Sequence, residues 1–110
     1  MHAVAYIFRR KKGLTLDQFL ERYQSHREVM LKYSRGLVSY TQHPVREKHP
    51  IGDTYTTNDG ELYDAISVYV YEKPEDAHFS NCVPEIENDS MQFIDFDTMI
   101  SLPINRFSIL

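Results

Sequence analysis

The feature that most constrains the fold of this chain is its first apolar segment, residues 2–9. Hydrophobic side chains occupy both sets of alternating positions in this segment, so a β-strand here is apolar on both faces. Such a strand has to be covered on both faces, which places it inside a sheet rather than at an edge. The sequence therefore predicts a central strand over residues 2–9.

A helix is predicted directly after this strand. Thr15 and Gln18 have the T-x-x-Q spacing of a capping box, which marks a helix start. Apolar residues then recur at helical spacing in one stripe, formed by Leu16, Phe19, Leu20, Tyr23, Met30 and Leu31. His26 follows Phe19 by seven residues, about 20° from the same helical meridian. We therefore expect His26 to point toward the domain interior, and we expect Gly36 to end the helix.

The remaining elements complete an α+β pattern. Strands are expected over 37–47, 62–71 and 103–110, a short helix from residue 73, and a longer helix over 84–99. The order β-α-β-β-α-β is the ferredoxin-like arrangement, an antiparallel four-stranded sheet with helices on one face. His43-Pro44 indicates an edge position or an early end for the second strand. We expect a single domain over residues 1–110, with residues 48–60 as a long loop of the kind that often covers ligands.

Composition favours a globular domain in a reducing compartment. Hydrophobic residues make up 42 % and charged residues 25 % of the 110 residues, and no apolar run approaches the ~18 residues of a membrane span. No secretory signal is readable at the N-terminus. The single Cys82 has no internal disulfide partner and is expected to be buried. These features predict a cytoplasmic protein without a membrane segment.

Charge is distributed unevenly along the chain. Ten of the 12 Lys and Arg residues lie in residues 1–50, and twelve of the 16 Asp and Glu residues lie in residues 51–110. The basic run at residues 9–12 is interpreted as a solvated loop, because the acidic total would repel a nucleic acid. Since a pocket weakens so small a core, we expect a homodimer, with basic and acidic surfaces paired across it.

Common metal and nucleophile signatures are missing from the sequence. It contains no G-x-G-x-x-G, P-loop, H-x-x-x-H or triad motif. His43, His49 and Asp53 are near enough in sequence to share a metal, but loop histidines more often face water. We therefore expect no metal site. Cys82 has no activating base nearby in sequence, so a nucleophilic role is not expected.

His26 is the strongest candidate for chemistry. A buried imidazole must be hydrogen-bonded or line a cavity, because an unpartnered polar group costs about 1–3 kcal/mol. The first case describes a structural core histidine, and the second describes a catalytic one. Tyr23 lies on the same helical stripe. Tyr63, Ser67 and Tyr69 share one face of the strand over 62–71, and Asp64 lies on the other. Whichever face meets the helix therefore offers either hydroxyls or a carboxylate as partners for His26.

The tyrosines suggest what such a pocket would bind. The chain has eight tyrosines and six phenylalanines. A phenol ring combines apolar contact with a hydrogen-bonding tip, which suits a planar, oxygenated ligand such as a phenol or a polyketide. The alternative is that the tyrosines only edge the core.

Several segments together resemble the EthD-type proteins of the dimeric α+β barrel superfamily, which include small fungal polyketide-tailoring enzymes. Residues 12–19 (KGLTLDQF) are similar to the family's entry to its first helix, and residues 23–30 (YQSHREVM) to its Y/W-x-x-H-H-x-P-L segment. Residues 63–66 (YDAI) resemble its Y-D-A/G-I strand. Asp89 with residues 93–95 (FID) resembles its D-x-x-x-F-L-D helix. The chain departs from the pattern at Arg27, where relatives more commonly have the second histidine.

The resemblance implies a homodimer without a cofactor, and a pocket for dehydration, cyclisation, decarboxylation or related reactions on polyketides. We hypothesise a lyase, a dehydratase or cyclase acting on an aromatic or pre-aromatic substrate of secondary metabolism, with His26 as general base. Asp64, if within reach, would fix its tautomer, and Tyr23, Tyr40 or Tyr69 would protonate the leaving group or hold the enolate. The residues expected to bind substrate are Phe19, Arg27, Tyr40, Tyr63, Ser67, Tyr69 and Phe93. The alternatives are a non-catalytic binding protein for small aromatics and a cofactor-free monooxygenase or decarboxylase.

Overall fold

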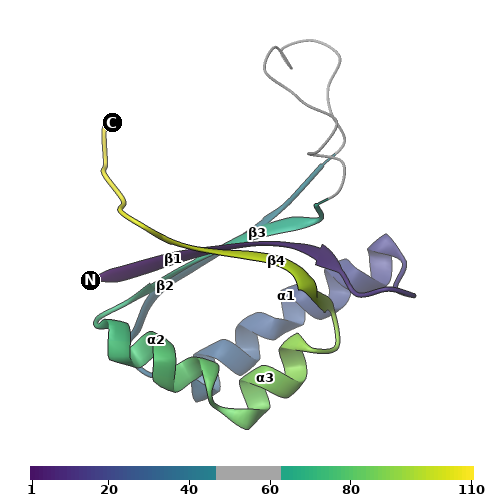
Figure 1. The fold of residues 1–110 in the computed structure, drawn as a ribbon, viewed down its shortest axis with the longest axis horizontal. Coiled ribbons are helices and arrows are strands. Elements are labelled where there is room, and N and C mark those ends of the chain that lie inside the picture. Colours follow the sequence, from purple (N-terminus) through teal and green to yellow (C-terminus); the bar gives the residue numbers. More distant parts are fainter. Residues whose placement is uncertain (47–62) are drawn as a thin grey trace.

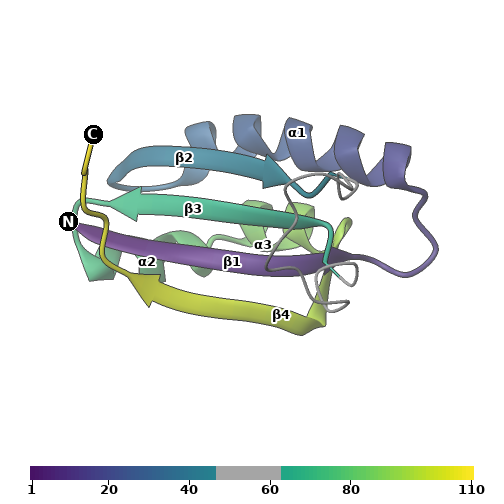
Figure 2. The same ribbon diagram turned by 90° about the horizontal axis from the view of Figure 1, so that it is seen from above.

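The computed structural model describes residues 1–46 and 63–110. Its elements are β1 (His2–Arg10), α1 (Leu16–Tyr33), β2 (Leu37–Pro44), β3 (Ala65–Tyr71), α2 (Pro74–Asn81), α3 (Pro84–Ser90) and β4 (Ile94–Ile104). The strands form one antiparallel sheet in the order β2-β3-β1-β4 (Figure 2). All three helices lie on one side of this sheet, and the C-terminal segment lies on the other (Figure 1). The predicted ferredoxin-like α+β fold is confirmed.

The two positional predictions for strands are also confirmed. β1 lies inside the sheet, where it pairs with β3 along one side and with β4 along the other. β2 lies at the edge and ends at Pro44, which has no amide hydrogen for a further ladder bond. The apolar composition of β1 thus corresponds to its central place in the sheet.

Helix α1 begins as its sequence predicts. The Thr15 side chain accepts a hydrogen bond from the Gln18 amide, and the Gln18 side chain accepts one from the Thr15 amide. The buried residues of the helix are Phe19, Tyr23, His26 and Met30. Leu31 was expected in the same stripe, but it is 76 % exposed because it lies at the edge of the stripe that faces away from the sheet.

The C-terminal third of the chain differs most from expectation. A single helix over 84–99 and a strand from residue 103 were predicted. The helix instead ends at Ser90, and β4 already begins at Ile94. Ile94 pairs with Arg10 and Ile100 pairs with Ile7, so pairing with β1 overrides the helical spacing of the apolar residues.

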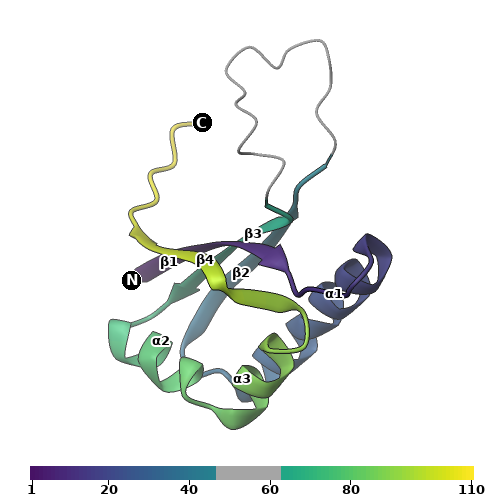
Figure 3. The ribbon, with the colours of Figure 1, turned by 45° about the vertical axis from the view of Figure 1, so that its right-hand side comes forward.

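The core forms two adjoining clusters between the sheet and the helices. One is built from Phe8, Phe19, Tyr23, Ala65 and Phe93, and the other from Val4, Met30, Tyr69, Tyr71, Ala77 and Ile86. Seen from another angle, α1, α2 and α3 all lie below the twisted sheet (Figure 3). None of the described helices is both long enough and apolar enough to span a membrane.

Candidate functional site

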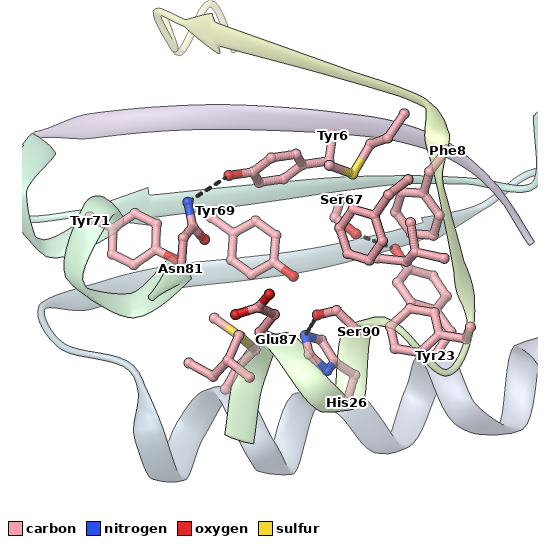
Figure 4. Close-up of a pocket in the computed structure, with 16 residues that line it drawn as sticks. Tyr6, Phe8, Tyr23, His26, Ser67, Tyr69, Tyr71, Asn81, Glu87 and Ser90 are labelled. Atoms are coloured by element: carbon pink, nitrogen blue, oxygen red, sulfur yellow. Dashed lines mark hydrogen bonds between the residues drawn. The ribbon is translucent and has the colours of Figure 1, made fainter. Parts of the chain in front are cut away.

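A pocket of about 260 Å³ lies between the sheet and the helices. Aromatic and aliphatic side chains make up most of its wall, and a smaller set of hydroxyl, amide, carboxylate and imidazole groups faces the same space (Figure 4). It is lined by Tyr6, Phe8, Tyr23, His26, Met30, Ser67, Tyr69, Tyr71, Asn81, Ile86, Glu87, Ser90, Phe93, Ile94, Phe96 and Met99. An apolar cavity with a few convergent polar groups is typical of small-molecule sites.

His26 is the central polar group of this pocket. It is only 2 % exposed, as helical phase predicted, and its ring packs edge-on against Phe93. Its Nδ1 atom lies 2.6 Å from Oδ2 of Asp89, and its Nε2 atom lies 3.5 Å from Oγ of Ser90. Since a carboxylate can only accept, the ring proton belongs on Nδ1, and Nε2 presents its lone pair toward Ser90 and the pocket.

The surroundings of His26 favour the neutral imidazole. Burial lowers the pKa of His26 below its usual value, and the hydrogen bond and negative charge of Asp89 oppose that shift only in part. A neutral histidine whose free nitrogen faces a pocket is able to take up a proton from a ligand. Asp89 would then stabilise the imidazolium that forms.

Three tyrosines beside His26 are held in their protonated form. Burial is the main reason that the pKa values of Tyr23, Tyr40 and Tyr69 are raised. The rings of Tyr40 and Tyr69 stack with 4.3 Å between their centroids. In Figure 4 the hydroxyl of Tyr69 points from the sheet toward the side of the pocket that carries His26 and Ser90. These phenols are therefore neutral hydrogen-bond donors rather than anions.

Hydrogen bonds fix Tyr23 and Tyr40 in place. The Tyr23 hydroxyl donates to the Ile66 carbonyl at 3.2 Å, and it shares a 2.7 Å bond with the Ser67 hydroxyl. The Gln42 side-chain amide donates to the Tyr40 hydroxyl and to the Tyr23 carbonyl. The Tyr23 and Ser67 hydroxyls thus form a polar spot within an aromatic wall.

The structure brings five of the predicted site residues together on the pocket wall. They are His26, Tyr23, Ser67, Tyr69 and Phe93. Phe19 is fully buried in the core behind the wall, and Tyr40 lies behind Tyr69, on which it stacks. Arg27 is exposed on α1, because it lies outside the buried stripe to which its neighbour His26 belongs. Tyr63 lies under the Arg9 guanidinium instead of lining the pocket.

The expected pairing of Asp64 with His26 is wrong. The Asp64 carboxylate accepts a 2.7 Å hydrogen bond from the Arg10 amide and lies 3.9 Å from the Arg10 guanidinium. Asp64 stands just before β3, beside the end of β1. The carboxylate that orients His26 is Asp89, on α3.

Sequence reasoning missed several polar residues of the site. Neither Glu87 nor Asp89 was predicted as a site residue, but Glu87, although exposed, lines the pocket, and Asp89 binds His26. Tyr6, Asn81 and Ser90 were not singled out, and the Asn81 amide donates to the Tyr6 hydroxyl at 3.3 Å. The one available signal was the family-like pattern that begins at Asp89.

Two further predictions concern metals and cysteine. Within residues 1–46 and 63–110 no cluster of three or more potential metal-binding side chains is found. The His43 ring nitrogen bonds to the Thr41 hydroxyl, while His49, Asp53 and the loop over 48–60 lie outside the described residues. Cys82 is exposed, so the prediction that it is buried is wrong. It caps α2, where the chain turns toward α3 at the surface.

Solved structures share this fold over nearly the whole chain. A protein of Arabidopsis thaliana superposes with a TM-score of 0.69 at 9 % identity, covering 100 % of this chain and 99 % of its own. A dimeric ferredoxin-like protein of unknown function from Jannaschia gives 0.66 at 7 % identity, with 96 % and 100 % coverage. An ethyl tert-butyl ether D (EthD) family protein of Bacillus halodurans gives 0.64 at 13 % identity, with 97 % and 100 % coverage. At these identities the likeness establishes the fold alone.

A comparison with the sequence profiles of protein families gives information beyond the fold. No curated protein sequence matches the chain significantly. The sequence profile of the EthD domain, however, matches residues 11–97. That range contains α1, β2, β3, α2 and α3, and with them His26, Asp89 and Ser90. The chain therefore belongs to the EthD domain family.

Proposed function

We propose that this protein is a cofactor-independent lyase, a dehydratase or cyclase that acts on a polyketide-derived, aromatic or pre-aromatic substrate of secondary metabolism. The observation that carries the proposal is the hydrogen bond between Asp89 and Nδ1 of His26, which leaves Nε2 unprotonated on the side of the ring that faces Ser90 and the aromatic pocket. A loss of water that aromatises a ring needs a base for an acidic carbon proton and a donor for the developing oxygen charge. The pocket contains both kinds of group.

His26 would act as the base. Its Nε2 atom would remove the proton from a carbon activated by a neighbouring carbonyl, and Asp89 would stabilise the resulting imidazolium through Nδ1. A positioned general base of this kind contributes roughly 10²–10⁴ in rate. Burial supports this role because it keeps the imidazole neutral before the reaction.

Tyr69 would stabilise the oxygen of the enolate that forms. Its strongly raised pKa makes it a poor source of a free proton but a good neutral donor in a site of low polarity. Tyr23, with Ser67, supplies a second hydroxyl group on the same wall. The hydroxide that leaves would receive its proton from the His26 imidazolium.

The dimensions and walls of the pocket support a small aromatic substrate. A cavity of about 260 Å³ suits a molecule of one or two rings rather than a long chain. Phe93 and Tyr69 offer ring faces and edges for packing against such a molecule.

We also propose that the protein acts as a homodimer that packs through the outer face of the sheet. Ile66, Ile100 and Leu102 form an outer-face cluster that is 36–44 % exposed. Ser67 and Tyr69 of β3 line the pocket on the helical side, so strand alternation and the strand register place this cluster on the opposite face of the sheet. Ile66 and Ile100 flank Ile7, with which both pair. Related structures are described as dimeric, and a second copy would cover this apolar surface.

We further propose a cytoplasmic location. The exposed thiol of Cys82, which has no disulfide partner, fits such a reducing compartment.

A binding protein for small aromatics is the second candidate. The mainly apolar wall favours it, because such a pocket would retain an aromatic ligand without any reaction. It predicts saturable binding of the compounds tested below without conversion.

The decisive experiment compares the wild type with His26→Gln and His26→Ala. Each protein is incubated with one- and two-ring β-hydroxy ketones, and product is detected by new aromatic absorbance and by the loss of one water in mass spectra. We expect the variants to lose about 10²-fold or more in turnover. Glu28→Gln, at an exposed site on the same helix, serves as the control for expression and folding. Equal turnover by the His26 variants and the wild type would refute the mechanism.

A further inference from the structure

We infer that the same pocket supports a second chemistry, acyl transfer to water, with Ser90 as nucleophile, His26 as general base and Asp89 as the carboxylate that orients the base. The evidence is the arrangement of three side chains, in which the His26 ring lies between the Asp89 carboxylate and the Ser90 hydroxyl. Asp89 Oδ2 lies 2.6 Å from Nδ1 of His26, and Ser90 Oγ lies 3.5 Å from Nε2 of the same ring. A triad is recognised by this geometry rather than by sequence order, and hydroxyl to imidazole distances are often longer without a ligand.

The two partners of His26 are consecutive residues at the end of α3, which explains why no triad signature was visible in the sequence. Asp89 binds one ring nitrogen and Ser90 contacts the other, so α3 encloses the imidazole from both sides. The inference shares the His26 and Asp89 pair with the proposed lyase, but it assigns a new role to Ser90.

The environment of Ser90 distinguishes it from the other buried serines of the chain. Ser80 accepts a hydrogen bond from the Arg35 amide, and Ser67 is bonded to Tyr23. Both therefore have structural partners in the surrounding fold. Ser90 is 9 % exposed, lines the pocket, and directs its hydroxyl to the imidazole (Figure 4). A serine in this position can lose its proton to a base as it attacks a ligand.

An acyl transfer also needs donors for the oxyanion. The backbone amides that follow Ser90 are not available, because those of Met91, Gln92 and Phe93 already donate to carbonyls of α3 and its final turn. The Tyr69 hydroxyl points toward the same side of the pocket from the sheet (Figure 4). Tyrosine hydroxyls serve as oxyanion donors in other enzymes, so Tyr69 is the group assigned to this task.

The reaction balances with water as the only co-reactant. Ser90 Oγ forms a bond to the carbonyl carbon of an ester or thioester while its proton moves to His26 Nε2. The bond from that carbon to the leaving oxygen or sulfur breaks, and the leaving group takes the proton from Nε2. Water then repeats the sequence on the acyl-serine, which releases a carboxylic acid and restores Ser90. The volume and the apolar wall of the pocket suit a short or one-ring acyl group.

The test uses 4-nitrophenyl butanoate as substrate and a fluorophosphonate as covalent probe. We expect a burst of nitrophenolate followed by slower turnover, and a single phosphonate adduct that peptide mapping places on Ser90. Ser90→Ala should lower the rate at least about 100-fold, while Ser25→Ala, next to His26 but exposed and bonded to the Glu21 carbonyl, should not. Melting curves of each variant verify folding.

Several results would overturn the inference. They are hydrolysis no faster than in buffer, an adduct on any residue other than Ser90, and a Ser90→Ala variant that keeps the wild-type rate. The mapped adduct is measured on the wild type, so it decides the matter even where a variant folds poorly.

The same variants separate this inference from the proposed lyase. Ser90→Ala should lower ester hydrolysis far more than dehydration of β-hydroxy ketones, because Ser90 forms a covalent bond to the substrate only in ester hydrolysis, whereas His26→Gln should lower both activities strongly. Ester hydrolysis without any dehydration would refute the lyase and leave the triad standing. Dehydration without ester hydrolysis would refute the triad and leave the proposed lyase standing.

Discussion

At the scale of single residues, the site depends on the hydrogen-bond partners of one buried imidazole, that of His26. His26 is placed by α1, but its chemical state is decided by Asp89 and by burial. A histidine with an acceptor on one nitrogen and a free lone pair on the other has a defined tautomer, which is the property that a general base requires. Changes at Asp89 should therefore be visible in the titration of His26 itself.

Asp89→Asn should lower the pKa of His26 further and reduce the proposed activities. The carboxylate is what raises the pKa against burial, so its loss leaves desolvation unopposed. An amide can also donate to Nδ1 and move the ring proton to Nε2, which blocks the base, and a loss of at least about 100-fold is expected. Titration of the His26 ring protons by nuclear magnetic resonance measures the shift. Glu85→Gln, an exposed charge loss on the same helix, should leave the pKa of His26 unaltered.

The lowered pKa of His26 also predicts how stability depends on pH. Between the folded pKa and the unfolded value near 6.5, the unfolded chain binds more protons than the folded one. The contribution of His26 to stability is therefore complete above pH 6.5 and is lost as the pH falls toward the folded pKa. Urea unfolding at pH 7.5, 6.5 and 5.5 measures the effect. In His26→Gln this part of the decline should disappear, and an identical decline in both proteins would contradict the assignment.

At the scale of elements, α2 is held near the end of α1 by a compact polar contact. The Arg35 guanidinium donates to Asp76 at 2.8 Å, and the Arg35 amide donates to Ser80 at 2.9 Å. Gly36 has a φ of 67° and packs against the Asp76 carboxylate so closely that a Cβ would overlap it. Asn81, which lines the pocket, follows at the end of α2, so this contact helps to position one wall of the site.

Gly36→Ala should therefore destabilise the protein more than Gly13→Ala. Gly13 also has a positive φ, 92°, but a Cβ there would have no atom within 4 Å. Backbone strain alone should cost about 1–3 kcal/mol at either position. The displacement of Asp76 from Arg35 should add roughly 1 kcal/mol at Gly36. Urea unfolding of the two variants measures the difference, and equal losses would show that the Asp76 contact does not matter.

At the scale of the whole molecule, the helices cover one face of the sheet and leave the outer-face cluster of Ile66, Ile100 and Leu102 exposed. The pocket lies on the helical side, so association through the outer face would leave the pocket free. A second copy would remove apolar surface from water, which is a net gain for a domain of this size.

Ile66→Glu should convert the proposed dimer to a monomer. A charge at the centre of an apolar interface loses its hydration without gaining a partner. Size-exclusion chromatography with light scattering gives the mass directly. Leu31→Glu, at a 76 % exposed site on the helical side, is the matched control and should remain dimeric. A dimer that survives Ile66→Glu would place the interface elsewhere.

Local patterns in the sequence determined most of the elements before residue 84 and two parts of the site. Helical phase placed His26 among the buried residues of α1, and strand alternation placed Ser67 and Tyr69 on one face of β3. The capping box fixed the start of α1. These features depend on residues within one or two turns of each other, so they are readable without the fold.

Only the tertiary structure decided which of these residues meet. The partner of His26 is Asp89, 63 residues away, and not Asp64, which is bonded to Arg10 at the end of β1. The break of the expected helix over 84–99 follows from pairing between β1 and β4, and it places Ser90 at the imidazole. Long-range contacts of this kind have no local periodicity, so the sequence by itself placed the histidine, whereas the packing of α3 against α1 chose its carboxylate and its serine.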